Sequence, residues 1–334
     1  MPLTSDVLRK LTKLPPGKAW ALLVGETRNV MYESVSAKDT DGKMSEIARR
    51  DQEVGLMDHF LSSVGWDLWK EFGNAVPKNS QNLKDWQRKP YDAKAILILD
   101  CLSLREMPLL LKGADTHGFS VLQNDVLASE LPGETTEFAR ALGFSSRSQL
   151  QSGGAKNANF PDFRTESVNY PWRDCAGLID ASKNWIFWHH WPDGKVHENS
   201  SAGAGLTNVL KDAEKVFESD DFWDFAAKLA KGRRLVITSD HGYAFTGSFI
   251  DADGAIGTFL KEKFSGGRNT DKLGDVGPYA PPVLLELDGI SGTRQMALGR
   301  RKWKSQGGYP VLTHGGLSLL EVLCPFVELS KTEA

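Results

Sequence analysis

The stretch Ala95-Ile96-Leu97-Ile98-Leu99-Asp100 sets the architecture of this chain. Five consecutive apolar residues have the length of a strand that is buried on both faces, and the run ends at a charged carboxylate. Two further runs have the same design. Trp185-Ile186-Phe187-Trp188 leads to His189, and Leu235-Val236-Ile237-Thr238 leads within two residues to Asp240.

These apolar runs, together with a fourth at 282–287, alternate with helical segments such as 209–229. This alternation predicts an α/β fold with a mostly parallel sheet and helices on both faces. In such sheets ligands bind at the carboxyl ends of the strands. Asp100, His189 and Asp240 stand at that edge, so we expect the functional site there.

The first 90 residues differ in character from the rest, and we predict two parts: a small, partly helical N-terminal extension at 1–90 and a core at 91–334. Within the extension, the run Trp20-Ala21-Leu22-Leu23-Val24 favours a strand, and 51–72 has the apolar spacing of a helix. Within the core, we expect 151–174 and 254–277 to be cap loops over the sheet edge.

The composition excludes several classes of protein. A chain of 334 residues, 40% of them hydrophobic, can bury a full core. Its net charge of -3 and pI near 6.2 provide no global basic field for nucleic acid or an anionic membrane. The basic run at 300–304 leaves nucleic acid open as a partner, although we interpret it as a solvated loop. The chain has no signal-peptide pattern and no apolar stretch of bilayer length, so we expect a soluble, cytoplasmic protein.

Histidine and aspartate are concentrated in a few short motifs. Five of the seven histidines lie in or beside the segments 189–197, 240–242 and 313–316. Imidazole and carboxylate are ligands that Zn²⁺ and Mn²⁺ accept, and donors from distant segments can converge at one sheet edge. The three cysteines lack CxxC spacing, so a thiolate site is not indicated. The pattern predicts a two-metal site and metal-assisted hydrolysis.

Four blocks resemble the signature blocks of the PglZ domain, a branch of the alkaline phosphatase superfamily, and they occur in that family's order. They are Ile96–Glu106, Leu131–Arg140, Ile237–Gly242 and His314–Glu321. The Asp-His-Gly motif of the third block and the His-Gly-Gly-x-Ser motif of the fourth are the most specific. The resemblance spans roughly 93–330. It implies an alkaline-phosphatase-like core and an association with phage-defence systems such as BREX.

The resemblance also implies two ligand sets for two divalent ions, with Zn²⁺ expected and Mn²⁺ as the alternative. The first set is Asp100, Asp240 and His241, and the second is Asp193, His197 and His314. Asp193 and His197 reproduce the Asp-x-x-x-His spacing of the superfamily. Many PglZ domains have aspartate at the position of His197. At this position the chain differs from those domains and is more similar to the standard metal site of the superfamily.

A hydroxyl nucleophile is implied in the second block, where counting back from Arg140 favours Thr136 over Thr135. A hydroxyl coordinated to a divalent cation ionises near neutral pH, on the logic that lowers the pKa of metal-bound water to about 7. The candidates for contacts with the substrate phosphate are Arg105, Arg140, His189 and His190. Two alternatives stay open, namely that Arg105 anchors the first helix and that the two histidines are a packed pair.

These features predict a metal-dependent phosphohydrolase, a phosphodiesterase with a threonine nucleophile, acting on phosphoester or nucleotide substrates. Two cations about 4 Å apart can bind the attacking and the leaving oxygen of an in-line displacement at phosphorus. The alternative is a weakly active or non-catalytic component of a phage-defence assembly that acts by binding partner proteins. The full ligand set favours the enzyme.

Overall fold

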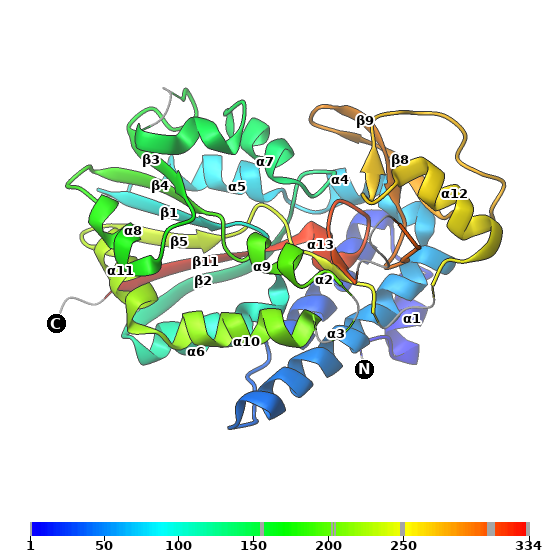
Figure 1. The fold of residues 1–334 in the computed structure, drawn as a ribbon, viewed down its shortest axis with the longest axis horizontal. Helices are drawn as coiled ribbons and strands as arrows, with labels where there is room; N and C mark the ends of the chain where they lie inside the picture. The colour runs from blue at the N-terminus through cyan, green and yellow to red at the C-terminus, as the bar shows by residue number, and fades with distance from the viewer. Residues whose placement is uncertain are drawn as a thin grey trace.

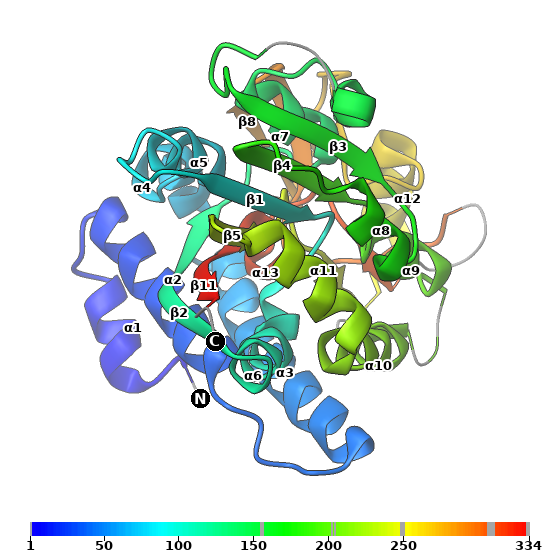
Figure 2. The same ribbon diagram turned by 90° about the vertical axis from the view of Figure 1, so that its left-hand side faces the viewer.

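The computed structural model describes residues 2–153, 157–201, 203, 205–247, 251–305 and 311–331. Its central sheet has six strands (Figures 1 and 2). In spatial order they are β2 (Phe119–Ala128), β11 (Leu323–Lys331), β5 (Arg234–Thr238), β1 (Lys94–Leu99), β4 (Asn184–His189) and β3 (Phe163–Val168). β1 is parallel to β4 and β5, and β3 is parallel to β4, whereas β11 runs antiparallel to β5 and β2. The predicted α/β fold with a mostly parallel sheet is therefore confirmed.

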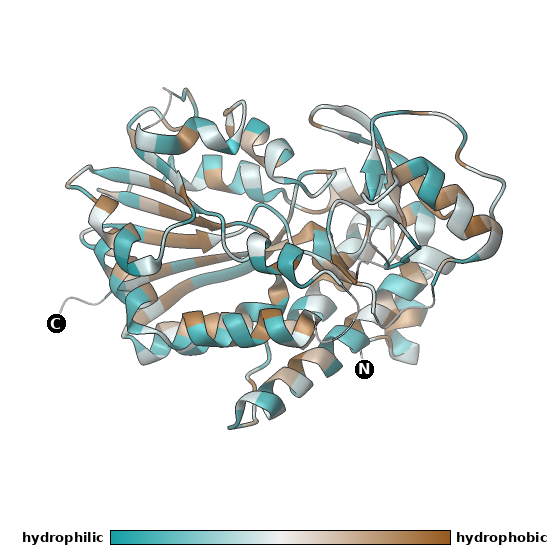
Figure 3. Cartoon of the chain, viewed as in Figure 1, coloured by the Kyte–Doolittle hydropathy of each residue, from teal (hydrophilic) through white to brown (hydrophobic). Residues whose placement is uncertain are grey.

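Helices cover both faces of this sheet, and the side chains of β1 alternate between them. Ile96 and Ile98 belong to a hydrophobic cluster with α5 (Asn79–Trp86), α7 (Thr135–Leu142) and the 3₁₀ helix η3 (Arg147–Gly153). Leu97 and Leu99 belong to the cluster of the opposite layer, which contains α6 (Met107–Thr116), α8 (Trp172–Leu178), α10 (Gly205–Glu218) and α11 (Asp220–Ala230). Burying each such side chain stabilises the fold by about 1.5–3 kcal/mol. Figure 3 shows the result as apolar strands between helices whose outer sides are polar.

The first 90 residues are helical and share the core of the rest. They form α1 (Ser5–Leu11), α2 (Pro16–Tyr32), α3 (Thr40–Ser63), η1 (Trp66–Glu71), α4 (Phe72–Ala75) and α5. Buried side chains of α3, among them Val54 and Met57, belong to the same hydrophobic cluster as Leu97 of β1. The predicted boundary near residue 90 thus corresponds to no break in this cluster.

Two predictions for the N-terminal residues are wrong. Residues 20–24 lie within the helix α2 and not in a strand, since Trp20, Leu23 and Met31 are buried at helical spacing. A short apolar run is compatible with either structure, and here tertiary packing selects the helix. The helix predicted over 51–72 ends at Ser63 and is followed by η1, and the apolar Val64, which falls inside the predicted range, is 74% exposed. Within the described ranges, no helix is both long and apolar enough to span a bilayer.

The apolar run at 282–287 lies outside the central sheet. It enters β8 (Leu284–Gly289), which pairs antiparallel with β9 (Gly292–Ala297) in a three-stranded sheet completed by β7 (Asn269–Thr270). This sheet packs against α12 (Gly254–Phe264), so the region 254–277 is not purely a loop. The region 151–174 likewise contains β3, whose polar sequence is ordered by pairing with β4. The remaining short elements are η2 (Leu104–Glu106), α9 (Asp193–Glu198), β6 (Ala244–Phe245), β10 (Leu312–Thr313) and α13 (Leu319–Val322).

The basic run at 300–304 is not a solvated loop. Arg300 is fully buried and donates hydrogen bonds to Asp51 and Asp58 of α3. Trp303 is also buried, and its indole N–H donates to the carbonyl of Ser265 at 3.1 Å. The run ties the C-terminal part of the chain to α3, which weakens its interpretation as a nucleic-acid contact.

Candidate metal centre

The carboxyl ends of three strands bring together the carboxylates predicted to bind metal. Asp100 directly follows β1, Asp240 follows β5 after one residue, and Asp193 begins α9 beyond β4. Two triads result, and within each the three donor atoms lie within 4.8 Å of one another. The triads are Asp100, Asp240 and His241, and Asp193, His197 and His314. The structure therefore brings together the members of each predicted ligand set.

Asp240 is oriented by the backbone around it. Its Oδ1 accepts hydrogen bonds from the N–H of Cys101 at 2.9 Å and from the N–H of His241 at 3.0 Å. Cys101 has a φ of 67°, an unusual left-handed conformation for a residue with a side chain. The other oxygen, Oδ2, is buried without a hydrogen-bond partner among the described residues. Since an unpaired buried carboxylate oxygen is costly, a cation is the partner that fits this position.

Backbone carbonyls set the tautomers of the two histidines His241 and His314. His241 Nδ1 lies 2.9 Å from the oxygen of Gly242, and His314 Nδ1 lies 3.3 Å from the oxygen of Gly133. A carbonyl can only accept, so in each ring Nδ1 carries the proton and Nε2 has a free lone pair. Each Nε2 lies 3.4 to 3.8 Å from carboxylate oxygens of its own triad. Metal-binding imidazoles have this arrangement, in which the second nitrogen is held by an outer acceptor.

The second triad is built on one turn of helix. Asp193 begins α9 and His197 lies four residues later, so that His197 Nε2 is 3.2 Å from Asp193 Oδ1. Burial raises the pKa of Asp193, but the hydrogen bond from His197 and the charges of His314, His197 and His241 together outweigh it and leave the pKa below its usual range. Burial, reinforced by the neighbouring His241, lowers the pKa of His314 to about 3. Asp193 is thus ionised and His314 neutral, which are the forms that bind metal.

Thr135, the first residue of α7, is the threonine that the structure brings to the first triad. Its Oγ1 lies 3.2 Å and 3.4 Å from the two carboxylate oxygens of Asp100. Thr136 is exposed on the outside of the helix. Adjacent helical residues point about 100° apart, so the two side chains cannot both face the centre. The geometry therefore places Thr135, and not Thr136, beside the first triad, in contrast to the preference drawn from the spacing to Arg140.

Arg147, on η3, is a site residue that the sequence patterns do not predict. Its guanidinium forms an ion pair with Oδ2 of Asp100. Burial lowers the pKa of Arg147, while the nearby carboxylates of Asp240 and Asp193 raise it. Arg147 therefore lies close to both triads. A lone arginine among serines, in the segment 145–148, carries no local signal of this placement.

The centre has a surplus of negative charge. It contains three carboxylates, and among the described residues Arg147 is the one arginine or lysine within 4.0 Å of their oxygens. Three carboxylates and one guanidinium leave two formal negative charges. Asp100 and Asp240 are fully buried, and uncompensated buried charge costs several kcal/mol per ion. Divalent cations would remove this cost.

Arg105 is not a phosphate contact. It is fully buried, and its Nε and Nη2 donate to Oδ1 of Asp51 at 2.9 Å and 2.6 Å. Its Nη1 donates to the hydroxyl of Ser103 at 3.0 Å and to the carbonyl of Tyr243 at 2.6 Å. Arg105 instead joins α3 to the loops after β1 and β5, so it has an anchoring role, although the helix it anchors is α3 and not the first helix.

Arg140 is also directed away from the triads. It is exposed on α7, and its Nη1 donates to the carboxylate of Glu137 at 3.2 Å and to the hydroxyl of Ser291 at 2.6 Å. Ser291 lies in the turn between β8 and β9, so the side chain of Arg140 is directed toward that hairpin. The predicted role of Arg140 in substrate binding is therefore not supported by its placement.

His189 and His190 have different surroundings. Both ring nitrogens of His189 are occupied, by the carbonyl of Tyr170 at 2.9 Å and by the N–H of Trp191 at 3.0 Å. Its ring is stacked on Trp172 with 3.9 Å between centroids, and burial lowers its pKa to about 4. His189 is thus a packed, neutral side chain, and its ring nitrogens are not available for contact with a substrate phosphate. His190 is half-buried. Burial, together with the charge of Arg147, lowers the pKa of His190 to about 4. Since Arg147 acts on it, His190 lies beside the centre.

Two glycines, one in the Asp-His-Gly motif and one in the His-Gly-Gly-x-Ser motif, are required by the backbone geometry. A Cβ on Gly242 would lie 2.3 Å from the carbonyl oxygen of Leu320, so the Asp-His-Gly loop can approach that segment only with glycine. Gly315 has a φ of 92°, a left-handed conformation that favours glycine. These positions bring His241 and His314 together, and their rings stack with 4.3 Å between centroids.

The sequence matches no protein-family profile and no curated protein. Among solved structures, murine ectonucleotide pyrophosphatase/phosphodiesterase 5 superposes with a TM-score of 0.42 at 10% sequence identity, covering 71% of this chain and 87% of that chain.

Proposed function

We propose that this protein is a metal-dependent phosphodiesterase that uses Thr135 as its nucleophile at a two-metal centre. The observation that carries the proposal is the pair of ligand triads at one sheet edge, with the Thr135 hydroxyl 3.2 Å from Asp100. The buried atoms without partners, Asp240 Oδ2 and His241 Nε2, support cation binding at the first triad. The chemistry of the donors, carboxylate and imidazole, suits Zn²⁺ and also Mn²⁺.

The first triad would hold one cation and the second triad the other. When bound, the two cations would favour ionisation of the attacking hydroxyl and stabilise the charge that develops on the phosphoryl and leaving oxygens. The side chains and the backbone of this chain make the other contributions to catalysis.

Thr135 Oγ1 gives up its proton and attacks phosphorus, and the bond between phosphorus and the leaving alkoxide breaks. The leaving group takes up a proton and departs as an alcohol, and the phosphoryl group on Thr135 keeps its second ester group. Water then hydrolyses the bond between Thr135 and phosphorus, which releases a phosphomonoester and restores the hydroxyl. Asp100 accepts a hydrogen bond from the Thr135 hydroxyl and so directs Oγ1 into the centre. The N–H groups in the first turn of α7 have no intrahelical acceptor, and they favour a phosphoryl oxygen beside Thr135.

The charges around the centre favour diesters over monoesters. A monoester carries an additional negative charge, which a monoesterase meets with extra positive groups. Arg105 and Arg140 are engaged elsewhere, so Arg147 is the arginine in position to contact the transferred group. Its guanidinium would exchange Asp100 for a phosphoryl oxygen when substrate binds. The association with phage defence stays a prediction from the PglZ resemblance.

The decisive experiment compares the neighbouring variants Thr135→Ala and Thr136→Ala with a chromogenic phosphodiester and a chromogenic monoester, in protein loaded with Zn²⁺ or Mn²⁺. Loss of the nucleophile should lower turnover by about a hundredfold or more, because the covalent route is removed while the electrostatic stabilisation remains. Thr135→Ser should retain activity, and Thr136→Ala should remain within about twofold of wild type because its side chain is exposed.

Several results would contradict the proposal. Equal losses in the two alanine variants would remove the assignment of Thr135, and a loss in Thr136→Ala alone would move the nucleophile by one residue. A preference for the monoester would reject the diester assignment. Protein that holds two metal ions but cleaves neither substrate would favour the alternative of a binding component.

A further inference from the structure

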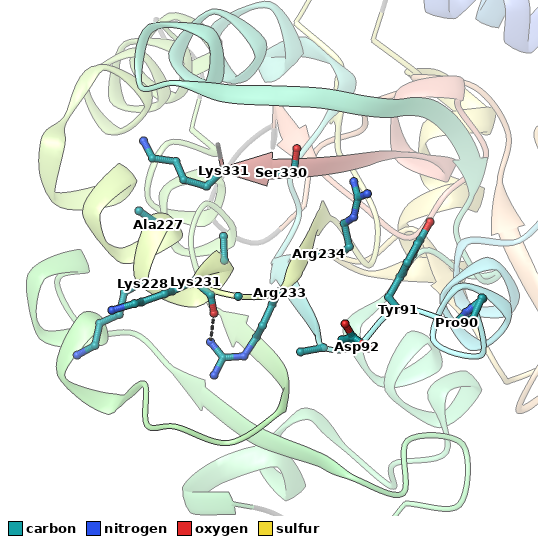
Figure 4. Close-up of a pocket in the computed structure, with 13 residues that line it drawn as sticks. Pro90, Tyr91, Asp92, Ala227, Lys228, Lys231, Arg233, Arg234, Ser330 and Lys331 are labelled. Carbon is teal, nitrogen blue, oxygen red and sulfur yellow. Dashed lines mark hydrogen bonds between the residues drawn. The ribbon is translucent and has the colours of Figure 1, made fainter. Parts of the chain in front are cut away.

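A second hollow lies at the opposite edge of the central sheet from the metal centre. It has a volume of about 1060 Å³. Its walls come from residues 90–93 before β1, residues 227–234 between the end of α11 and the start of β5, and Ser330 and Lys331 at the end of β11 (Figure 4). Since Asp100 follows the other end of β1, the full length of that strand separates the two sites.

The lining of this hollow is strongly basic. It contains one carboxylate, that of Asp92, and five cationic side chains: Lys228, Lys231, Arg233, Arg234 and Lys331. Within the part of the chain that the structure describes, no carboxylate lies within 4.0 Å of any of the five. The chain as a whole has a net charge of -3, so this cluster is a local reversal of sign and not part of a general basic surface.

Three of these five cationic side chains donate hydrogen bonds to backbone carbonyls. Arg233 donates to the carbonyls of Leu229 and Lys231, and so covers the negative end of the α11 dipole. Lys228 donates to the carbonyl of Ala176 at 2.6 Å, and Lys331 to that of His117. These bonds satisfy donors and fix the side chains in place. Lys228 and Lys331 keep their charges without a carboxylate partner among the described residues, whereas the carboxylate of Asp180 acts on the charge of Arg233.

Lys231 and Arg234 are the two cations best able to receive a ligand. For neither side chain is a hydrogen bond or an ion pair to a described residue found. The guanidinium of Arg234 lies over the ring of Tyr91 at 5.3 Å, which holds it against one wall. In Figure 4 Arg234 stands on one side of the hollow and Lys228, Lys231 and Lys331 stand on the other, with the ammonium ends of Lys228 and Lys331 turned away from Arg234. A planar guanidinium held by a ring is preorganised for a phosphate oxygen.

We propose that this hollow binds a phosphorylated small molecule of nucleotide size, with its phosphates on Lys231 and Arg234. The volume is slightly above the usual range of small-molecule sites, about 300–1,000 Å³. Pro90, Ala227 and Ala230 provide an apolar surface beside the cations for the uncharged part of the ligand. A short basic lining on an acidic protein fits a discrete ligand better than a nucleic-acid backbone, which needs an extended basic track.

The proposal is tested by equilibrium binding of a fluorescent ATP analogue, measured by polarisation in the presence of EDTA so that the metal centre contributes nothing. We expect saturable binding, competition by unlabelled ATP and no competition by adenosine. Each charge-assisted hydrogen bond is worth about tenfold in affinity, so the double variant Lys231→Gln/Arg234→Gln should bind at least about tenfold more weakly. The matched control Lys10→Gln/Lys13→Gln removes two exposed charges near α1 and should bind within about twofold of wild type.

The outcomes are separable from the activity of the metal centre. Binding that survives in Asp240→Ala but is lost in Lys231→Gln/Arg234→Gln supports the proposal whether or not the protein is a phosphodiesterase. Absence of ATP binding at millimolar concentration, or equal weakening in the control variant, would overturn it. A single-stranded oligonucleotide that binds far more tightly than ATP would overturn it in favour of a nucleic-acid surface. Thermal unfolding of each variant checks that the fold is retained.

Discussion

Replacing Arg105 by glutamine should destabilise the fold without impairing the binding of substrate. Arg105 is fully buried and makes four hydrogen bonds, two to the carboxylate of Asp51 and one each to Ser103 and Tyr243. Breaking a buried ion pair from one side costs about 3–5 kcal/mol, because the other charge remains buried. Here Arg300 keeps its contacts of 2.8 Å to both oxygens of Asp51. We therefore expect the free energy of unfolding to fall by the lower limit of this range, about 3 kcal/mol.

This free energy translates into a measurable change in Tm. The unfolding entropy is about 2.1 cal/mol/K per residue, which for 334 residues is about 0.7 kcal/mol/K. A loss of about 3 kcal/mol should therefore lower the Tm by about 4 °C. The control Arg9→Gln removes an arginine that is 66% exposed and paired with Asp6. An exposed pair of this kind is worth at most about 1 kcal/mol, so the control should lower the Tm by less than about 1.5 °C.

Calorimetry and steady-state kinetics on the same preparations distinguish the two roles of Arg105. If Arg105 anchors α3, the Tm falls and KM for a phosphodiester stays within about threefold of wild type at 25 °C, where most of the protein remains folded. If Arg105 contacts the phosphate, KM should rise by about tenfold or more with little change in Tm. The second pattern would refute the structural role.

Three further outcomes are expected. Elemental analysis should find two divalent ions per chain after incubation with Zn²⁺, and Asp240→Ala should lose at least one, because its triad loses a ligand; a variant that retains two would contradict the ligand set. Arg147→Gln should raise KM for diesters by about tenfold while metal content is kept, whereas Arg140→Gln, whose side chain bonds Glu137 and Ser291, should not. His189 has a folded pKa of about 4, below the unfolded value near 6.5, so its contribution to stability is complete above pH 6.5 and is lost progressively toward pH 4, by up to about 3 kcal/mol. Chemical denaturation of His189→Gln should show a flatter dependence on pH over that window, and an unchanged slope would exclude this histidine as the cause.

Local patterns were sufficient to predict the strands at the centre of the sheet. The apolar run of β1 is buried on both faces and ends at Asp100, and a strand of that kind belongs inside a parallel sheet whatever the rest of the chain does. Because parallel strands end at one edge, the approach of Asp100 to Asp240 follows from the same pattern. The run at 20–24 was ambiguous for the opposite reason, since five apolar residues suit a strand or a buried helix equally.

Contacts between distant segments account for what these patterns could not predict. Thr135 and Thr136 are chemically identical neighbours, and the rotation of α7 against Asp100 selects the first. Arg105 has the charge expected of a phosphate contact, but Asp51, 54 residues away, receives its guanidinium. Arg147 reaches the centre through the placement of η3, which no residue near it encodes by itself. Chemical type and local periodicity can be read along the chain, whereas the direction in which a side chain points depends on partners that folding brings from elsewhere.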